Sequence, residues 1–252
     1  QFAYSLLTRS QRISHENLRL RDAQWLGGFE AWMARHLPRP DGSDTPDDAA
    51  PAADAAPVAG AGAAPPMLLP LQVRGVRLKN RIVVSPMATY SAVDGVVQDF
   101  HLVHLGARAL GGAALVMVEM TSPTPEGRIT PGCTGLWNDT QEAGLRRIVD
   151  FVHGQSSALI GLQLGHSGPK GSTQVGWEIG DEPLPADGPH ANWPLLAASA
   201  VAYGAQNQTP AAMTRADMEQ MRDAFVASTR RAMAAGFDWL ELHCAHGYLL
   251  AS

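Results

Sequence analysis

Four short apolar runs, each followed by polar residues, recur along the second two-thirds of the chain. Stretches with the apolar periodicity of α-helices separate them. Mostly continuous apolar runs are typical of strands that are buried on both faces, as in parallel sheets. The alternation therefore predicts an α/β fold in which helices connect parallel strands through right-handed crossovers. The predicted strands are Arg81–Ser85, Ala114–Met120, Ala158–Leu164 and Phe237–His243.

Three helices are predicted between these strands from apolar spacing and from residues that favour helix ends. Capping signals mark each start, and glycines mark the ends of the first and the last. The predicted helices are His101–Leu110 after Asp99 and before Gly111-Gly112, Thr140–His153 at the sequence Asp139-Thr-Gln-Glu142, and Thr214–Ala235 at the sequence Thr214-Arg-Ala-Asp217 and before Gly236.

Two architectures share this pattern, a doubly wound sheet and a (β/α)8 barrel. A complete eight-stranded barrel takes about 250 residues. Met67–Ser252 supplies 186 residues and four strands. We therefore expect the N-terminal half of a barrel, as part of a longer protein.

A segment rich in alanine, proline and aspartate precedes the strands. Residues 41–66 hold ten Ala, five Pro and five Asp, with no Lys or Arg. With so few side chains able to pack, this composition predicts a flexible, disordered linker. Residues 1–40 contain Trp25, Phe29, Trp32 and Met33 at helical spacing, which predicts one amphipathic helix. Because so few residues cannot bury a core, we interpret 1–40 as the tail of a preceding domain.

Composition narrows the function classes. The net charge of −5 matches that of the linker alone and argues against nucleic acid as the main partner. No apolar run approaches the roughly 18 residues that a membrane span requires. Two cysteines, Cys133 and Cys244, fit a reducing compartment, so we expect a cytoplasmic protein without a disulfide framework.

Polar residues follow each predicted strand, and in parallel sheets and barrels such strand ends converge in space. The clusters are Ser85-Pro-Met-Ala-Thr-Tyr90, Glu119-Met-Thr121, Gln163-Leu-Gly-His-Ser-Gly-Pro-Lys170 and His243-Cys-Ala-His-Gly-Tyr248.

His243 and His246 are the most informative residues in these clusters. In a continuing strand they would lie on opposite faces, but a turn at Gly247 would let both face one pocket. Two imidazoles there can donate hydrogen bonds to a carbonyl oxygen that gains negative charge, and Tyr248 offers a phenolic proton. A zinc site of His243, Cys244 and His246 is an alternative, but no fourth ligand at typical spacing supports it, and we expect no metal.

Two further features are weaker. Gln163 ends an apolar strand, and its amide suits a pyrimidine-like ring edge because it can both donate and accept hydrogen bonds. His101 and His104 lie one helical turn apart. With no carboxylate nearby in sequence, we expect them to be packing or surface residues.

Three runs together resemble the old yellow enzyme family of FMN-dependent ene-reductases, which are β/α barrels. They are Lys79-Asn-Arg-Ile-Val-Val-Ser-Pro-Met87, Gly161-Leu-Gln-Leu-Gly-His166 and Glu241-Leu-His-Cys-Ala-His-Gly-Tyr-Leu-Leu250. The resemblance covers about Met67–Ser252 and passes in order through the strand ends.

This resemblance implies specific roles and cofactors. The implied cofactor is FMN, with NADH or NADPH as the reductant. The implied substrate is a small molecule with an activated alkene, an α,β-unsaturated carbonyl. The implied flavin-contacting residues are Ser85, Pro86, Met87, Ala88, Met120 and Gln163. Tyr90, His243 and His246 would bind substrate, and Tyr248 would donate the proton. A homo-oligomer of the full-length protein is compatible with it.

Two departures refine the resemblance. Ala88 stands where many members carry Cys or Thr, and Pro169 stands where simple members often carry Arg. The run His166-Ser-Gly-Pro-Lys-Gly-Ser-Thr-Gln-Val-Gly-Trp-Glu178 resembles a subgroup in which an FAD-dependent aryl-CoA hydroxylase is fused to such a reductase. Residues 1–40 resemble the tail of that hydroxylase, and the substrate would then be a dearomatised aryl-CoA. A metal-dependent hydrolase barrel and a non-catalytic partner-binding chain remain as alternatives.

Overall fold

The structure is a computed structural model that describes residues 22–36, 66–177 and 182–252. The predicted linker, except for Pro66, lies outside the described residues, as does most of the predicted N-terminal tail. The chain divides into two compact units, residues 1–82 and residues 83–252.

The first unit contains one longer helix and a short antiparallel hairpin. Trp25 stacks on Phe29 with ring centroids 5.3 Å apart, and Phe29 stacks on Trp32 at 6.5 Å. These contacts confirm the helical spacing that the aromatic residues predicted. The hairpin was not predicted, because runs of three residues give no periodicity to detect. The elements are α3 (Ala23–His36), η1 (Pro66–Leu68), β1 (Leu71–Val73) and β2 (Val76–Leu78).

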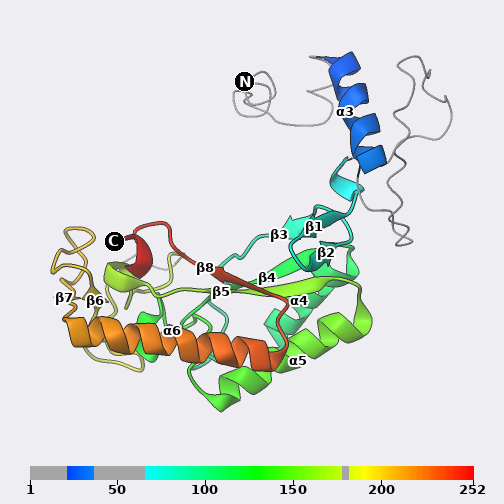
Figure 1. Cartoon of the computed structure of the whole chain (residues 1–252). Helices are drawn as coiled ribbons and strands as arrows, with labels where there is room; N and C mark the ends of the chain where they lie inside the picture. Colours follow the sequence, from blue (N-terminus) through cyan, green and yellow to red (C-terminus); the bar gives the residue numbers. More distant parts are fainter. Residues whose placement is uncertain (1–21, 37–65, 178–181) are drawn as a thin grey trace. The chain divides into compact units, whose positions relative to one another are not determined.

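The second unit is built on a parallel four-stranded sheet (Figure 1). Its strands follow one another in sequence order, β3-β4-β5-β8, and every neighbouring pair is parallel. All four predicted strands are therefore confirmed, with each boundary within two residues. The strands are β3 (Val83–Val84), β4 (Leu115–Thr121), β5 (Leu159–Leu164) and β8 (Trp239–Leu242).

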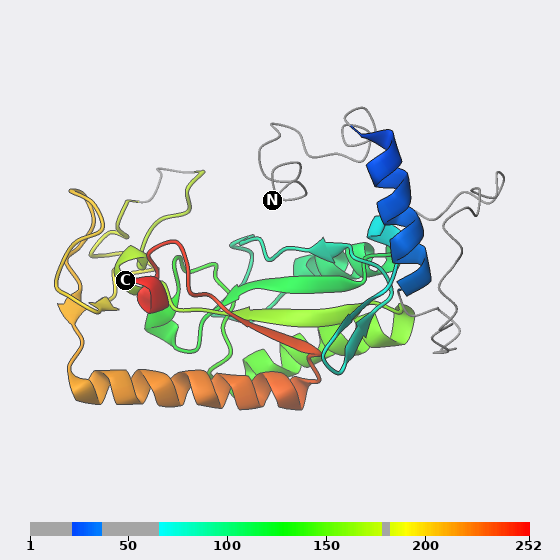
Figure 2. The same ribbon diagram turned by 45° about the horizontal axis from the view of Figure 1, so that its top comes forward.

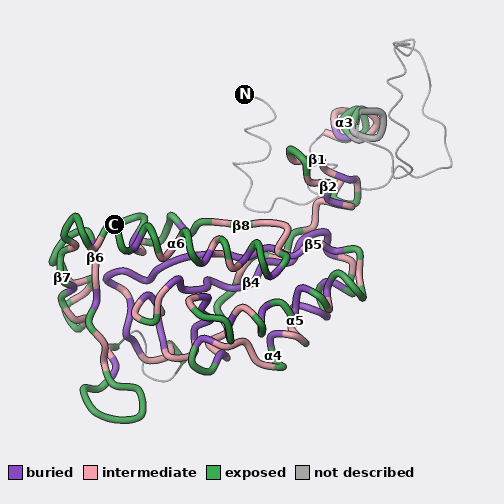
Figure 3. Tube along the Cα trace, turned by 60° about the horizontal axis from the view of Figure 1, so that its bottom comes forward, coloured by how far each residue is buried: buried purple, intermediate pink, exposed green. Residues whose placement is uncertain are grey.

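Three helices cover one face of this sheet, as Figures 1 and 2 both show. They are α4 (Asp99–Leu110), α5 (Asp139–Gln155) and α6 (Arg215–Ala235). Apolar side chains from the sheet and the helices meet in a fully buried layer, which lies along β4 and β5 in Figure 3. Truncating such a side chain to alanine costs about 2–5 kcal/mol. The largest members are Leu136, Leu145, Ile148, Ile160, Leu162 and Leu164.

The predicted helix ends at Gly111 and Gly236 are confirmed, whereas the predicted helix starts agree for α6 and differ by one residue for α4 and α5. Thr214 caps α6 with Asp217 in a capping box, and Gly236 ends the helix with φ 92°, as predicted. The N-cap of α4 is Gln98 rather than Asp99, and that of α5 is Asn138 rather than Asp139. Asp99 and Asp139 are therefore the first residues of their helices. The polar residue before each of them can also take part in a capping hydrogen bond, so it serves as the N-cap.

The pairing of β4 with β5 contains an irregularity close to the strand ends. Val118 pairs with Leu162, but the next aligned pair is Thr121 with Leu164. Two residues of β4 therefore oppose the single residue Gln163, which is the count of a β-bulge. The extra residue breaks the alternation of sides along β4 at Glu119 and Met120.

The loops after the strands gather at one end of the sheet, on the left in Figures 1 and 2. Ser167 N donates to Gly127 O at 2.8 Å and Thr173 N donates to Ile129 O at 2.9 Å, so the loops after β4 and β5 are bonded to each other. The long connection before α6 also contains a parallel pair that the sequence did not predict. The short elements here are η2 (Pro125–Gly127), η3 (Gly168–Lys170), β6 (Leu196–Ala197), β7 (Ala211–Ala212) and η4 (Leu249–Ala251).

No helix in the described ranges is long and apolar enough to cross a membrane.

Candidate functional site

Three rings come together directly after β8. The ring centroids of His243 and His246 lie 5.0 Å apart, those of His243 and Tyr248 lie 4.9 Å apart, and all three pairs are edge-to-face. This arrangement confirms that the chain turns after the strand instead of separating the two histidines. A tight cluster of two imidazoles and a phenol presents several hydrogen-bond donors to one small volume.

The turn that gathers these rings requires an unusual backbone. His246 has φ 59° and Gly247 has φ 67°, so both lie in the left-handed region, which costs little only for glycine. Lys170 Nζ donates to His246 O at 2.6 Å and stabilises the strained residue. Leu249 N donates to His166 O at 3.1 Å, which fixes the chain beyond the turn.

His243 is present as a neutral hydrogen-bond donor. Ala245 N donates to its Nδ1 at 3.3 Å, so the ring proton is on Nε2. Burial lowers the pKa of His243, and the neighbouring His246 lowers it further, while Glu241 acts in the opposite direction. Only 8% of the residue is exposed. At neutral pH its Nε2–H can therefore donate to a ligand oxygen without carrying a charge.

Gln163 and Glu241 form a cross-strand pair between β5 and β8. They are aligned in the register, and Gln163 Nε2 donates to Glu241 Oε1 at 2.5 Å. This bond orients the amide, so that its carbonyl oxygen serves as the remaining acceptor. Sequence reasoning selected Gln163 but missed Glu241. The alternation Trp239, Glu241, His243 along β8 was the available signal.

Met120 lies beside the histidine cluster because of the bulge in β4. A Cβ on Gly165 would lie 2.8 Å from Met120 Cγ and 2.9 Å from His243 Cβ. Only a glycine lets these side chains approach so closely. The structure thus brings Met120 and His243 to the same place, as the sequence predicted.

Residues 85–90, the loop after β3, present an exposed edge to this region. Ser85, Met87 and Ala88 are exposed, Met87 at 54%, and Pro86 and Tyr90 are half-buried. Tyr90 and Tyr248 pack against the same buried cluster of Met120, Ile129 and Cys133. The loop after β3 and the turn after β8 are therefore neighbours.

Further aromatic groups surround the turn. Tyr90 and Trp177 have ring centroids 5.6 Å apart. Lys170 Nζ lies 4.0 Å from the ring centroid of Tyr203 and 5.6 Å from that of Tyr248. Sequence reasoning placed Lys170 only in the polar cluster after the third strand, and no pattern in the sequence could have placed it against the tyrosines.

These residues fit a flavin. A pyrimidine edge needs a fixed amide, which Gln163 provides through its bond to Glu241. Gly165, which has no room for a Cβ, lets Met120 and His243 lie close together beside the end of β5. Among the described residues, no group of three or more His, Cys, Asp or Glu could hold a metal ion.

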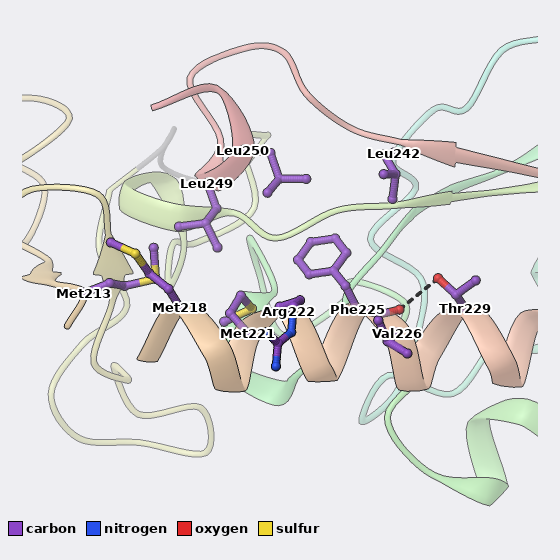
Figure 4. A pocket seen from close by; sticks show the side chains of 10 residues that line it. All are labelled: Met213, Met218, Met221, Arg222, Phe225, Val226, Thr229, Leu242, Leu249 and Leu250. Carbon is purple, nitrogen blue, oxygen red and sulfur yellow. Dashed lines mark hydrogen bonds between the residues drawn. The ribbon is translucent and has the colours of Figure 1, made fainter. Parts of the chain in front are cut away.

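An apolar cavity is a different feature and lies on the helix side of β8 (Figure 4). Its volume is about 440 Å³, and its walls are apolar. Leu242 from β8 and Leu249 and Leu250 from η4 face Phe225 on α6 across it. None of the predicted site residues lines it, so the polar cluster at the strand ends is the candidate active site.

Parallel strands in sequence order, with helices on one face and convergent polar side chains at the carboxyl ends, define the architecture of a (β/α)8-barrel enzyme. The four strands form the N-terminal half of such a barrel.

The family described as NADH:flavin oxidoreductase / NADH oxidase matches residues 66–252, and the chain belongs to this family, which includes the old yellow enzymes. The chain is 42% identical over 193 residues to an NADH:flavin oxidoreductase of Gibberella zeae, covering 72% of this chain and 44% of that protein. It is 42% identical over 183 residues to an NADPH dehydrogenase of Geobacillus thermodenitrificans, covering 72% and 48%.

Among solved structures, the Old Yellow Enzyme from Pichia sp. AKU4542 matches with a TM-score of 0.64 and 28% identity, over 74% of this chain and 47% of that one. This neighbour decides for a barrel over a doubly wound sheet. The chain spans about half the length of the relatives that it matches. The family uses FMN with NADH or NADPH as reductant.

Proposed function

We propose that the full-length protein is a flavin-dependent oxidoreductase that reduces the activated alkene of an α,β-unsaturated carbonyl compound with NADH or NADPH. The cluster of His243, His246 and Tyr248 carries this proposal, because it places oxygen-binding and proton-donating groups at one strand end. Membership of the NADH:flavin oxidoreductase family supports the redox chemistry.

Bound FMN would supply the hydride-transfer chemistry between the nicotinamide and the β-carbon of the alkene. Gln163 would hold the pyrimidine edge, Met120 would lie against the ring, and residues 85–88 would line it. The protein's contribution is to place the substrate and to polarise it.

His243 and His246 bind the carbonyl oxygen of the substrate in this proposal. Hydride addition at the β-carbon moves negative charge onto that oxygen, and a neutral Nε2–H from His243 stabilises it. Tyr248 then gives its phenolic proton to the α-carbon, which completes addition of one hydride and one proton across the double bond. Tyr90, packed on the same buried cluster as Tyr248, contacts the substrate from the opposite loop.

Substitution of the two key rings tests the reaction. With the full-length protein, a flavin absorbance spectrum first establishes the cofactor. Tyr248→Phe should leave flavin reduction by the nicotinamide unchanged and slow flavin oxidation by 2-cyclohexenone, because only the proton is removed. His243→Ala should cost on the order of 10²–10³ in that oxidative step. Equal losses in both half-reactions would assign these residues to flavin binding instead.

We further propose the fused organisation for this chain. Residues 1–40 would be the tail of a preceding FAD-hydroxylase-like domain, 41–66 a flexible linker and 67–252 part of the FMN barrel. The run from His166 to Glu178 and the buried Pro169 support a substrate resembling a dearomatised aryl-CoA. Assaying the full-length protein with an aryl-CoA and with the free aryl acid tests this: turnover that does not depend on the CoA group contradicts it.

The proposal for partners is a small-molecule substrate and a homo-oligomer of the full-length protein. Sedimentation of the flavin-loaded protein measures the second part directly. A monomer at micromolar concentration would contradict it.

A further inference from the structure

Glu119 is a buried carboxylate that the proposed reaction does not use. It lies in the bulge of β4, and only 5% of the residue is exposed. Burying a charged group is costly unless hydrogen bonds compensate for the lost hydration. Glu119 lies at the carboxyl end of a central strand, where the functional groups of such folds gather. The groups that bind its carboxylate are therefore held close to the candidate site.

Thr89 provides two short hydrogen bonds to this carboxylate. Its backbone N donates to Glu119 Oε2 at 2.5 Å, and its Oγ1 donates to Glu119 Oε1 at 2.6 Å. Each carboxylate oxygen is thus engaged by a different group of the same residue. A paired contact of this kind fixes the orientation of Thr89 as well as its distance, and hydrogen bonds to a charged acceptor are roughly twice as strong as neutral ones.

His101 joins the carboxylate to the first turn of α4. Gln98 N donates to His101 Nδ1 at 3.0 Å, so the ring carries its proton on Nε2. Nε2 lies 3.0 Å from Glu119 Oε1 and so contacts the carboxylate, although the direction is not that of a hydrogen bond. The partner of this helix histidine comes from a strand, so inspection of the neighbouring sequence could not have found it.

Thr89 occupies the position between two predicted site residues. Ala88 precedes it in the segment that would line the flavin, and Tyr90 follows it with φ 49°, in the left-handed region. For a non-glycine residue that conformation is strained and needs support from its surroundings. On the other side, a Cβ on Gly132 would lie 2.3 Å from Tyr90 O, so Tyr90 is enclosed there too.

We propose that Glu119 is a positioning residue that acts through Thr89: its carboxylate holds residues 85–90 in the conformation that contacts the flavin and directs Tyr90 toward the substrate. The inference rests on the proposed function. It extends that function to a residue that touches neither cofactor nor substrate. The bulge makes it possible, because Glu119 reaches Thr89 and His101 while its neighbour Met120 remains beside Gly165 and His243.

Three substitutions in the full-length, flavin-loaded protein test the role. Glu119→Gln replaces one acceptor oxygen by a donor, which opposes the donors of Thr89. Thr89→Val keeps the shape and the backbone N–H but removes the hydroxyl donor. Thr89→Ser retains both donors. Glu142→Gln is the matched control, because the side chain of Glu142 on α5 accepts hydrogen bonds from Arg146 and Arg231 and contacts neither Thr89 nor His101.

The measurements are the dissociation constant for FMN, kcat and KM for 2-cyclohexenone, and the melting temperature. Glu119→Gln and Thr89→Val should each weaken FMN binding and raise KM, by on the order of tenfold, while Thr89→Ser stays near wild type. Glu142→Gln should leave the dissociation constant for FMN and the KM for 2-cyclohexenone unchanged, even where it lowers the melting temperature. Wild-type FMN affinity and KM in Glu119→Gln and Thr89→Val would overturn the proposal.

A double-mutant cycle separates positioning from general stabilisation. If Glu119 acts through the loop that carries Tyr90, Tyr90→Phe should change KM much less in the Glu119→Gln background than in the wild type. Additive changes in KM would assign Glu119 a merely structural role. If Glu119→Gln does not fold, the same cycle with Thr89→Val decides.

The proposed function and this inference fail differently. A wild-type protein that binds no flavin contradicts both. A yellow, active wild type whose Glu119 and Thr89 variants bind FMN and enone normally contradicts the inference alone.

Discussion

His166 is buried immediately after β5, and its environment makes it a pH-sensitive element of stability. Gly168 N donates to its Nδ1 at 3.0 Å, so the neutral ring carries its proton on Nε2. Burial lowers the pKa of His166 from 6.5 to about 4. The His166 ring is therefore neutral throughout the physiological range. The backbone carbonyl of the same residue accepts from Leu249 N and so supports the turn after β8.

A pH dependence of stability follows from this shift. Between pH 6.5 and about pH 4 the unfolded chain protonates His166 while the folded chain does not, so stability is complete above pH 6.5 and falls as the pH decreases. The loss amounts to about 3 kcal/mol across that window. His166→Gln, which keeps an acceptor for Gly168 N and does not titrate, should remove this component.

Urea denaturation of wild type and His166→Gln at pH 7.5 and pH 4 measures the difference. If the two proteins lose the same free energy of unfolding between these pH values, the native ring is protonated and its burial does not have the predicted effect.

At the scale of elements, the sequence predicted periodic segments well and local geometry less well. Ile148 and Val152 lie on the apolar face that the spacing predicted for α5, and β4 and β5 lie where continuous apolar runs indicated. Gln98 and Asn138 replaced the predicted caps because adjacent polar residues compete for one position. The bulge at Glu119 has no signature in a single sequence, since it depends on which strand lies alongside.

The cap of α6 is the most testable of these local features. Thr214 Oγ1 accepts from Asp217 N at 3.2 Å, and Asp217 Oδ2 accepts from Thr214 N at 2.8 Å. Thr214→Ala should lower the free energy of unfolding by about 1 kcal/mol, while Thr214→Ser stays within a few tenths. Chemical denaturation of the three proteins measures this.

The same substitution has a second readout. The hydrogen bond from the Thr214 side chain is the main cause that lowers the pKa of Asp217, and the bond from the Thr214 backbone adds to it. In Thr214→Ala the pKa of Asp217 should rise toward its ordinary value, as an NMR titration would show. An unchanged pKa would mean that the capping box is not populated in solution.

At the scale of the whole molecule, the sheet has two open edges within the described residues. β3 and β8 each pair with one neighbour only, and Leu240 and Leu242 on β8 are exposed. Open edges of parallel strands invite pairing with other chains. In a barrel the inward side chains form layers that alternate strands contribute, and phosphate sites lie on the loops after strands seven and eight.

Residues 67–252, produced alone, should therefore be colourless and self-associating. Titrating FMN into the purified material, with sedimentation to establish its size, tests this expectation. A monomer that binds FMN with micromolar affinity would show that four strands make a sufficient site.

The predicted topology indicated that polar side chains would meet at the strand ends. It did not indicate every residue that takes part. His243, His246 and Tyr248 belong to one contiguous run, so a single turn sufficed to bring them together. Glu241 and Lys170 act through partners more than 70 positions away in the chain, Gln163 and His246. Contacts of that kind depend on strand register and loop path, which a single sequence does not specify.

The bulge in β4 also determines how this strand can change over evolution. Substitutions at Glu119 or Met120 alter one side chain and leave the path of the chain intact. Removing either residue would restore the regular alternation of side chains along β4. A single residue would then stand where Glu119 now reaches Thr89 and Met120 now lies beside His243. Single substitutions are therefore tolerated one at a time at these two positions. Deleting one residue would disturb both the contact of Glu119 with Thr89 and the position of Met120 beside His243. The number of residues in this part of β4 should therefore vary less among related proteins than the identity of Glu119 and Met120.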